Sequence, residues 1–237
     1  MRACEVEEFE LAWPRARVPR YISASDARPG PCRGPHFRTA AVNHSLRRPY
    51  RAVGLLVEGA SGTATTGFLV HPQAILTAAH CLTRNSSGFY FGLQYNRAEG
   101  GLWTRLRGAL LLRGWQERRD PRCDLALAWL ESPYDGEQPL TLTRALAGES
   151  ALILGYAFGA PHLWRSKSLA VDWHPRSESQ AATNLSEGSS GGPWLVKRGR
   201  DYAAAGMTTR GGPGFLLSPA WNKGPHLLLE AFRQVQT

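Results

Sequence analysis

The segment Glu187–Trp194 contains the residues whose types and order are best suited to covalent chemistry. It reads Glu-Gly-Ser-Ser-Gly-Gly-Pro-Trp. A serine becomes an effective nucleophile when a tight, glycine-rich turn exposes its hydroxyl and directs backbone N–H groups at a developing oxyanion. The frame Gly-x-Ser-Gly-Gly-Pro predicts Ser190 as the nucleophile and the amides of Gly188 and Ser190 as the oxyanion hole. Ser189 is the competing nucleophile, but it does not fit that frame.

A histidine that could act as a general base follows a strand, a turn and a second strand. The apolar runs Gly67–Val70 and Leu76–Thr77 flank a turn at residues 71–72, and two small residues precede His80. Small neighbours let a substrate approach the imidazole, whose ordinary pKa of about 6.5 leaves the neutral base available near neutral pH. An isolated histidine after an apolar run is more often structural, so His80 depends on the other motifs for support.

An acid that could orient this histidine stands at the start of the apolar stretch Leu125–Leu130. Asp124 directly precedes that stretch, which alternates with a period of two residues as a strand does. A buried carboxylate needs a partner, and a histidine N–H is a suitable one. Asp120 is a nearby alternative, but Pro121 follows it and it lies outside the strand pattern.

These motifs lie among many short apolar runs separated by turn residues, which indicates an all-β fold of barrels or sandwiches. One helix is expected at the carboxyl end, where Pro225 can occupy the first helical position and apolar residues recur at helical spacing. The predicted strands are Ala52–Val57, Thr66–Val70, Ala74–Thr77, Phe89–Leu93, Leu106–Leu112, Leu125–Leu130, Ala151–Tyr156, Ser168–Trp173, Pro193–Val196, Ala203–Thr208 and Gly214–Ser218.

The composition is that of a globular protein. The 237 residues are 43% hydrophobic and carry a net charge of +9, yet no apolar run is long enough to span a bilayer. The basic residues are mostly arginines spread along the chain, without a zinc-finger spacing, a phosphate-binding loop or an RNA-binding motif. Neither a nucleic-acid nor a membrane partner is expected. The four cysteines form no CxxC pair, so no metal or other cofactor is expected either.

Residues 1–48 differ in amino-acid composition from the rest of the chain. Prolines interrupt every candidate element and arginines are interspersed with acids, which predicts a poorly structured extension or propeptide. The segment has no apolar core of the kind that a secretory signal requires, so the sequence alone leaves the compartment undecided. Cys4 and Cys32 could form a bridge within this segment.

Taken together, three motifs resemble the trypsin-like serine peptidases. They are Thr77–Cys81, Asp124–Leu127 and Gly188–Pro193, and the order His, Asp, Ser differs from that of subtilisin-like enzymes and α/β-hydrolases. Finer likeness to the bacterial glutamyl-endopeptidase (V8-like) branch comes from Thr66–Val70, from Ser189–Trp194 and from the pairs at residues 114–115 and 155–156. The resemblance extends from about residue 50 to the carboxyl end.

The resemblance implies two antiparallel six-stranded Greek-key barrels with the active site between them and a C-terminal helix. The first barrel would span residues 49–133 with His80 and Asp124, and the second would span residues 134–237 with Ser190. It also implies a monomeric, secreted enzyme that acts on proteins or peptides through an acyl-enzyme intermediate.

Two departures from the family pattern bear on activation and on disulfides. Ser189 replaces the aspartate that pairs with a newly cut amino terminus in digestive members, so that activation switch should be absent. The cysteine that usually pairs with Cys81 is replaced by Thr65. A Cys81–Cys123 bridge is not favoured, because the neighbours of two facing side chains generally point apart.

The expected substrate pocket contains Asn184, Thr208 and Arg210. Asn184 stands where an acid would hold a basic side chain, which argues against cleavage after Arg or Lys. Thr208 occupies the position of the histidine that glutamate-specific relatives use, and Arg210 could supply positive charge or point to solvent. We therefore expect a non-basic primary specificity, acidic or neutral. The alternatives are an esterase that uses the same triad and a catalytically silent basic binding module.

Overall fold

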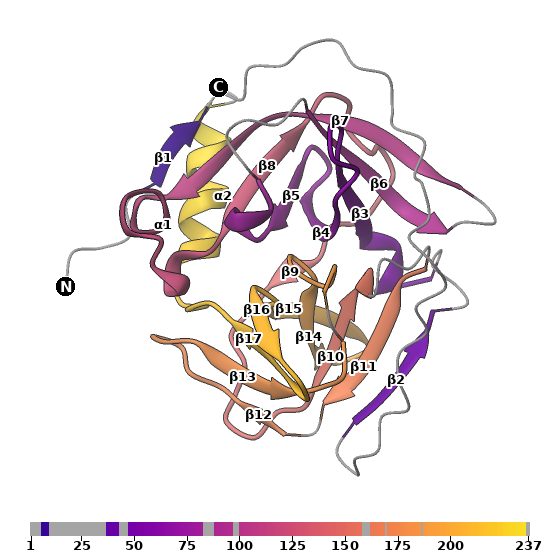
Figure 1. Ribbon diagram of the computed structural model, residues 1–237, viewed down its shortest axis with the longest axis vertical. Helices are drawn as coiled ribbons and strands as arrows, with labels where there is room; N and C mark the ends of the chain where they lie inside the picture. The colour runs from indigo at the N-terminus through magenta and orange to yellow at the C-terminus, as the bar shows by residue number, and fades with distance from the viewer. Residues whose placement is uncertain are drawn as a thin grey trace.

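The computed structural model describes residues 6–9, 37–42, 47–82, 88–96, 100–157, 162–168, 170–185 and 187–235. Its strands fall into two halves, one above the other in Figure 1, and the predicted all-β architecture with a C-terminal helix is confirmed. Cys4 and Cys32 lie outside the described residues. Within the described residues, no helix is long and apolar enough to cross a membrane.

The N-terminal half is a closed barrel of six strands. Its neighbours run in the order β7-β6-β3-β4-β5-β8, and pairing of β7 with β8 closes the ring. The inward side chains are large and apolar, and Phe68, Phe91 and Leu93 are fully buried. The strands are β3 (Val53–Glu58), β4 (Ala64–His71), β5 (Ala74–Thr77), β6 (Phe89–Asn96), β7 (Gly100–Leu112) and β8 (Ala126–Leu130).

The C-terminal half consists of two sheets whose strands are antiparallel except for the parallel pair β9 and β15. It therefore differs from the single six-stranded barrel that was expected. One sheet has six strands in the order β2-β11-β10-β14-β15-β9, and the other has four in the order β12-β13-β17-β16. The strands are β9 (Thr141–Leu142), β10 (Ala151–Gly155), β11 (Trp164–Ser168), β12 (Val171–Asp172), β13 (Ser179–Ala182), β14 (Pro193–Arg198), β15 (Asp201–Met207), β16 (Arg210–Gly212) and β17 (Phe215–Ser218).

Two of these strands were missed because their buried residues are small or polar. In β11 the inward residues are Ser166 and Ser168, both fully buried, and in β13 they are Ser179 and Ala181. An apolar pattern cannot identify such strands. The predicted strand Ser168–Trp173 is wrong in its bounds, since β11 ends at Ser168 and only the short β12 lies within the remainder.

The described parts of the amino-terminal segment, residues 1–48, include one strand in each half. β1 (Val6–Phe9) pairs with β7, and β2 (Phe37–Ala41) pairs with β11 along five residues. Figure 1 shows β2 at the outer edge of the C-terminal half, although it precedes the first barrel in sequence. β11 pairs with β10 on one side, and residues 109–112 of β7 lie beyond the pairing of β7 with β6, so a preceding segment can join both strands despite its prolines and arginines.

The crossing between the halves falls later than the predicted boundary at residues 133–134. Tyr134 is buried, and its hydroxyl donates to the carbonyl oxygen of Leu102 at 2.6 Å. The amide of Leu140 still donates to Leu69 in β4, whereas Thr141 begins β9 and pairs with β15. The chain therefore leaves the first barrel at Leu140–Thr141.

The carboxyl-terminal helix α2 (Gly224–Val235) packs on the N-terminal half, next to β7 and β8 (Figure 1). Leu228 and Phe232 are buried there, and the ring of Phe232 meets that of His71 with centroids 5.4 Å apart. The helix thus ties the end of the chain to the first barrel. The short helix α1 (Arg113–Arg118), which follows β7, was not anticipated.

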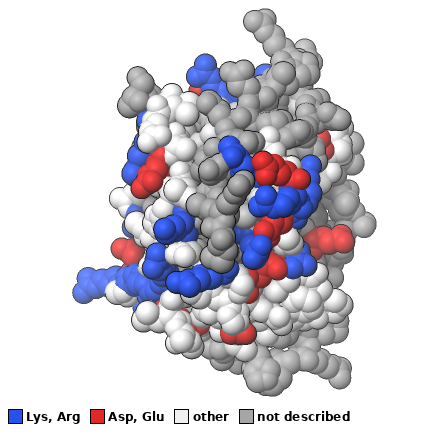
Figure 2. All heavy atoms as spheres, turned by 90° about the vertical axis from the view of Figure 1, so that its left-hand side faces the viewer, with Lys and Arg blue, Asp and Glu red and all other residues white. Residues whose placement is uncertain are grey.

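The face shown in Figure 2 mixes basic and acidic side chains. Around α1, which lies on this side in Figure 1, arginines pair with acids: Arg118 with Glu117 at 3.2 Å and Arg122 with Asp120 at 2.7 Å. The charges of Arg118 and Arg122 are therefore neutralised locally on this face.

Candidate active site

The backbone positions His80 directly after β5, in the 3-10 helix Ala79–Cys81. Its ring Nδ1 lies 2.7 Å from Oδ2 of Asp124, and its backbone N–H donates to Oδ1 of the same carboxylate at 2.9 Å. Asp124 is buried and precedes β8, which pairs with β5 so that Thr77 faces Ala126. The two residues meet because their strands are neighbours in the barrel.

Asp120, the alternative acid, is held elsewhere. Its side chain caps the 3-10 helix Pro121–Cys123 by accepting from the amide of Arg122 at 3.0 Å. The Arg122 guanidinium also binds it, and this contact holds the pKa of Asp120 below its usual range. The structure thus brings Asp124, and not Asp120, to the imidazole of His80.

The loop of Ser190 is docked on the N-terminal barrel. The amide of Thr66 in β4 donates to the carbonyl oxygen of Ser190 at 2.8 Å, and the Thr66 hydroxyl donates to the carbonyl oxygen of Gly188 at 2.8 Å. Gly191 has φ +83°, and a Cβ on it would lie 1.9 Å from the carbonyl oxygen of Thr66 and 2.4 Å from Oγ1 of Thr77. Only glycine permits both this conformation and this approach. The loop therefore sits against the strands that lead to His80.

The two serines of this loop differ in exposure. Ser189 is buried at 1% exposure, whereas Ser190 is half-buried and its hydroxyl donates to the carbonyl oxygen of Thr209 at 3.4 Å. A substrate needs an accessible nucleophile, so the exposures favour Ser190 over Ser189.

Two backbone amides of the loop have no hydrogen-bond partner among the described residues. They belong to Gly188 and Ser190, whereas the amides of Gly191 and Gly192 donate to Thr208 and Ser189. Gly188 has φ +87°, and a Cβ there would lie 2.4 Å from the carbonyl oxygen of Tyr156. The two amides expected to form an oxyanion hole are thus available to a ligand.

The electrostatics around His80 favour its protonated form. Burial lowers the pKa of His80, but the hydrogen bonds with Asp124 and Cys81 outweigh burial and raise that pKa to about 10. The ring of Trp115 in α1 flanks the imidazole, with centroids 6.3 Å apart and an angle of 56° between the planes. The neutral base consequently forms only as pH rises above the ordinary range for histidine.

The three residues expected in the substrate pocket have different environments. Asn184 is half-buried. Thr208 is 1% exposed, and its hydroxyl oxygen accepts from Nε1 of Trp194 at 2.9 Å. Arg210 is exposed, and its guanidinium binds both carboxylate oxygens of Glu178, with Nε 2.9 Å from Oε1. The charge of Arg210 is therefore paired.

Sequence reasoning missed Glu178, Thr66 and Thr209 as parts of this region. Thr66 lies within one of the segments on which the family resemblance rests. Its hydrogen bonds to Gly188 and Tyr156, however, could not be predicted from the residues around it in the sequence. Cys81 and Cys123 do not form a disulfide with one another, as favoured from the sequence. The Sγ atom of Cys81 lies 3.6 Å from Nε2 of His80 instead.

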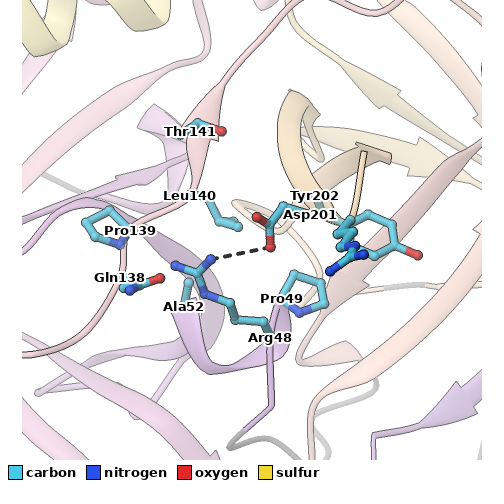
Figure 3. A pocket seen from close by; sticks show the side chains of 10 residues that line it. Arg48, Pro49, Ala52, Gln138, Pro139, Leu140, Thr141, Asp201 and Tyr202 are labelled. Atoms are coloured by element: carbon cyan, nitrogen blue, oxygen red, sulfur yellow. Dashed lines mark hydrogen bonds and ion pairs between the residues drawn. The ribbon is translucent and has the colours of Figure 1, made fainter. Parts of the chain in front are cut away.

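A cavity of about 160 Å³ opens where the extension, the interdomain crossing and the β14–β15 turn meet (Figure 3). Arg48 reaches across it to Asp201, with 3.4 Å between Nη1 and Oδ1. Gln138, Pro139 and Thr141 form the side opposite Tyr202. None of the expected site residues lines this cavity.

The profile of the trypsin-like peptidase domain matches residues 65–203, more than half of the chain. The chain belongs to the trypsin-like peptidase family. The matched range includes His80, Asp124 and Ser190, and membership makes this peptidase a serine-type endopeptidase. No curated protein sequence matches it.

Solved structures share the fold of this trypsin-like peptidase. A Glu endopeptidase in complex with MPD superposes with a TM-score of 0.70 at 17% identity, covering 81% of this chain and 95% of its own. The protease Anisep from Arthrobacter nicotinovorans gives 0.67 at 17% identity, covering 82% and 98%. The thermostable serine protease AL20 from an extremophilic microorganism gives 0.65 at 20% identity, covering 76% and 96%.

Proposed function

We propose that this peptidase hydrolyses peptide bonds through a triad in which Ser190 is the nucleophile, His80 the general base and Asp124 the orienting acid. The observation that carries the proposal is the 2.7 Å contact between Nδ1 of His80 and Asp124, next to the strand on which the Ser190 loop docks. Asp124 holds the imidazole so that Nε2 is the nitrogen available to the serine proton.

The chemistry follows from this arrangement. As the Ser190 oxygen attacks the substrate carbonyl, Nε2 of His80 takes the hydroxyl proton and Asp124 stabilises the imidazolium. The carbonyl oxygen becomes an oxyanion, which the free amides of Gly188 and Ser190 can bind. His80 then returns the proton to the leaving amine, and water hydrolyses the acyl-enzyme by the same steps in reverse.

An extended peptide fits this site better than a compact ester does. β16 is the terminal strand of its four-stranded sheet, and Thr209, which accepts from the Ser190 hydroxyl, directly precedes it. An exposed strand edge next to a nucleophile can pair with the backbone of a polypeptide. This feature favours the endopeptidase over the small-molecule esterase.

We propose a neutral residue at the cleaved position. Asn184 carries no charge to hold Arg or Lys. An acidic preference is less favoured, because Glu178 already binds Arg210, and the Thr208 hydroxyl oxygen accepts from Trp194. Peptide-library cleavage tests this choice, and efficient cleavage after Arg would overturn it.

Labelling with a fluorophosphonate tests the triad. The wild-type protein and Ser189→Ala should react, whereas Ser190→Ala should not and should lose about 10³-fold or more in kcat. Circular dichroism of each variant checks that the fold persists. Labelling of Ser190→Ala with loss in Ser189→Ala would assign the nucleophile to Ser189. No labelling of the folded wild-type protein would favour the silent binding module.

A further inference from the structure

A free thiol lies beside the nitrogen on which the proposed chemistry depends. The Sγ atom of Cys81 is 3.6 Å from Nε2 of His80, and Cys81 is half-buried. In the 3-10 helix Ala79–Cys81 the two residues are consecutive, so the backbone keeps the sulfur next to the imidazole. The contact lies within the range for a hydrogen bond that involves sulfur.

This contact competes with the triad for one atom. Nδ1 of His80 is engaged by Asp124, which leaves Nε2 as the only ring nitrogen that can receive the Ser190 proton. In this structure the Ser190 hydroxyl donates to the carbonyl oxygen of Thr209, while the sulfur of Cys81 faces Nε2. A substituent on that sulfur would lie against the base nitrogen.

Building on the triad proposed above, we propose that Cys81 is a modification site at which small-molecule disulfides block the general base His80. The mixed disulfide would place its new group against Nε2, where the nucleophile and the substrate must approach. The enzyme would be active while Cys81 is a thiol and inactive while it carries the adduct.

The geometry also supplies the chemistry of this modification. Nε2 of His80 takes the thiol proton, and the resulting imidazolium, which the raised pKa of His80 favours, stabilises the Cys81 thiolate that attacks one sulfur of the disulfide. A new S–S bond forms, the original one breaks, and the departing half leaves as a thiolate that is then protonated. The exchange consumes one disulfide and releases one thiol, and an external thiol reverses it.

The second described cysteine is the internal control. Cys123 is 3% exposed, and a Cβ on Gly114 would lie 2.7 Å from its sulfur, which shows how tightly it is enclosed. A disulfide reagent reaches exposed thiols first. Cys81, and not Cys123, should therefore react in the folded protein.

The test treats the full-length protein with 5,5′-dithiobis(2-nitrobenzoate), maps the adduct by peptide mass, and then measures fluorophosphonate labelling of Ser190. Labelling should fall by the same fraction as Cys81 is modified and should return with dithiothreitol. Cys81→Ser keeps a hydrogen-bonding group but cannot form the adduct, so its labelling should not respond to the reagent. Cys123→Ser should remain as sensitive as the wild-type protein.

Complete modification of Cys81 with undiminished labelling would overturn the proposal, as would inhibition that persists in Cys81→Ser. If the untreated protein is not labelled at all, the proposed triad fails, and the rate of Cys81 modification then decides the thiol proposal by itself. That rate should fall several-fold in His80→Gln, because the thiol loses its base. An unchanged rate would refute the pairing of Cys81 with His80.

Discussion

The side chain of Thr66 links the two halves of the molecule at the Ser190 loop. Its hydroxyl donates to the carbonyl oxygen of Gly188 at 2.8 Å and accepts from the amide of Tyr156 at 2.9 Å. Thr66 belongs to β4, whereas both partners belong to the C-terminal half. These bonds, together with the bond from the Thr66 amide to the carbonyl oxygen of Ser190, hold the Ser190 loop against the barrel that carries His80.

Thr66→Val should therefore impair both stability and catalysis. Valine keeps the shape but leaves a buried amide and a carbonyl without their partner, which should lower the free energy of unfolding by about 1–3 kcal/mol. We expect kcat to fall as well, because the loop loses an anchor. Urea unfolding and steady-state kinetics measure both effects. Thr66→Ser keeps the hydroxyl and should retain most of the activity; equal losses in the two variants would contradict this role.

Mutation of the two candidate acids, Asp124 and Asp120, should affect kcat very differently. Asp124→Asn removes the charge next to Nδ1 of His80 and favours the wrong imidazole tautomer, so kcat should fall by about 10⁴-fold. Asp120→Asn weakens only an exposed ion pair with Arg122 and keeps an oxygen that can cap the 3-10 helix, so kcat should change little. Kinetics of the two purified variants make the comparison. A large loss for Asp120→Asn alone would reverse the assignment.

The activity should rise towards alkaline pH. Only neutral His80 can accept the Ser190 proton, and its pKa is raised to about 10 by Asp124 and Cys81. The acidic limb of kcat/KM should therefore lie well above the ordinary histidine pKa of about 6.5. Cys81→Ala removes one of the two raising contacts and should move the limb to lower pH. A limb at or below the ordinary value in the wild-type protein would contradict the strength of these contacts.

The close approach at Gly191 should make it irreplaceable. Gly191→Ala places a Cβ 1.9 Å from the Thr66 carbonyl oxygen at φ +83°, so the loop must move and hydrolysis should be lost. Gly199 has a similar φ of +62° with nothing within 4 Å of a Cβ, so Gly199→Ala should cost only about 1–2 kcal/mol of stability. Fluorophosphonate labelling and thermal unfolding compare the pair. Full labelling of Gly191→Ala would show that the loop tolerates displacement.

The ion pair of Arg210 with Glu178 predicts a switch in substrate preference. Glu178→Gln removes the charge that the Arg210 guanidinium binds, which leaves that guanidinium free to attract acidic substrate residues. Cleavage of peptides with Glu or Asp near the scissile bond should increase and should weaken as salt rises. The stability should change by only about 0–1 kcal/mol, since the pair is solvent-exposed. If the wild-type protein and Glu178→Gln cleave the peptide library with the same preferences, Arg210 does not take part in substrate binding.

The sequence by itself was sufficient to propose the chemistry-bearing residues and to predict most strands of the first barrel. The motif around Ser190 could be recognised from the sequence because the local backbone conformation of the loop requires its glycines. Strands β3, β4, β5 and β8 could be recognised because many of their buried residues are apolar. Strands such as β11 and β13 could not, because serine and alanine fill their inward positions. The periodicity of apolar residues in a sequence reveals a buried strand only where the buried residues are themselves apolar.

Only the tertiary structure decided which groups meet. The pairing of β2 with β11, the bond from Thr66 to Gly188, the partnership of Arg210 with Glu178 and the contact between Cys81 and His80 are absent from any local pattern. Each depends on the register and packing of strands that lie far apart in sequence, or on the direction in which a side chain turns. Arg210 shows the consequence: its charge was visible in the sequence, but its neutralisation was a property of the fold.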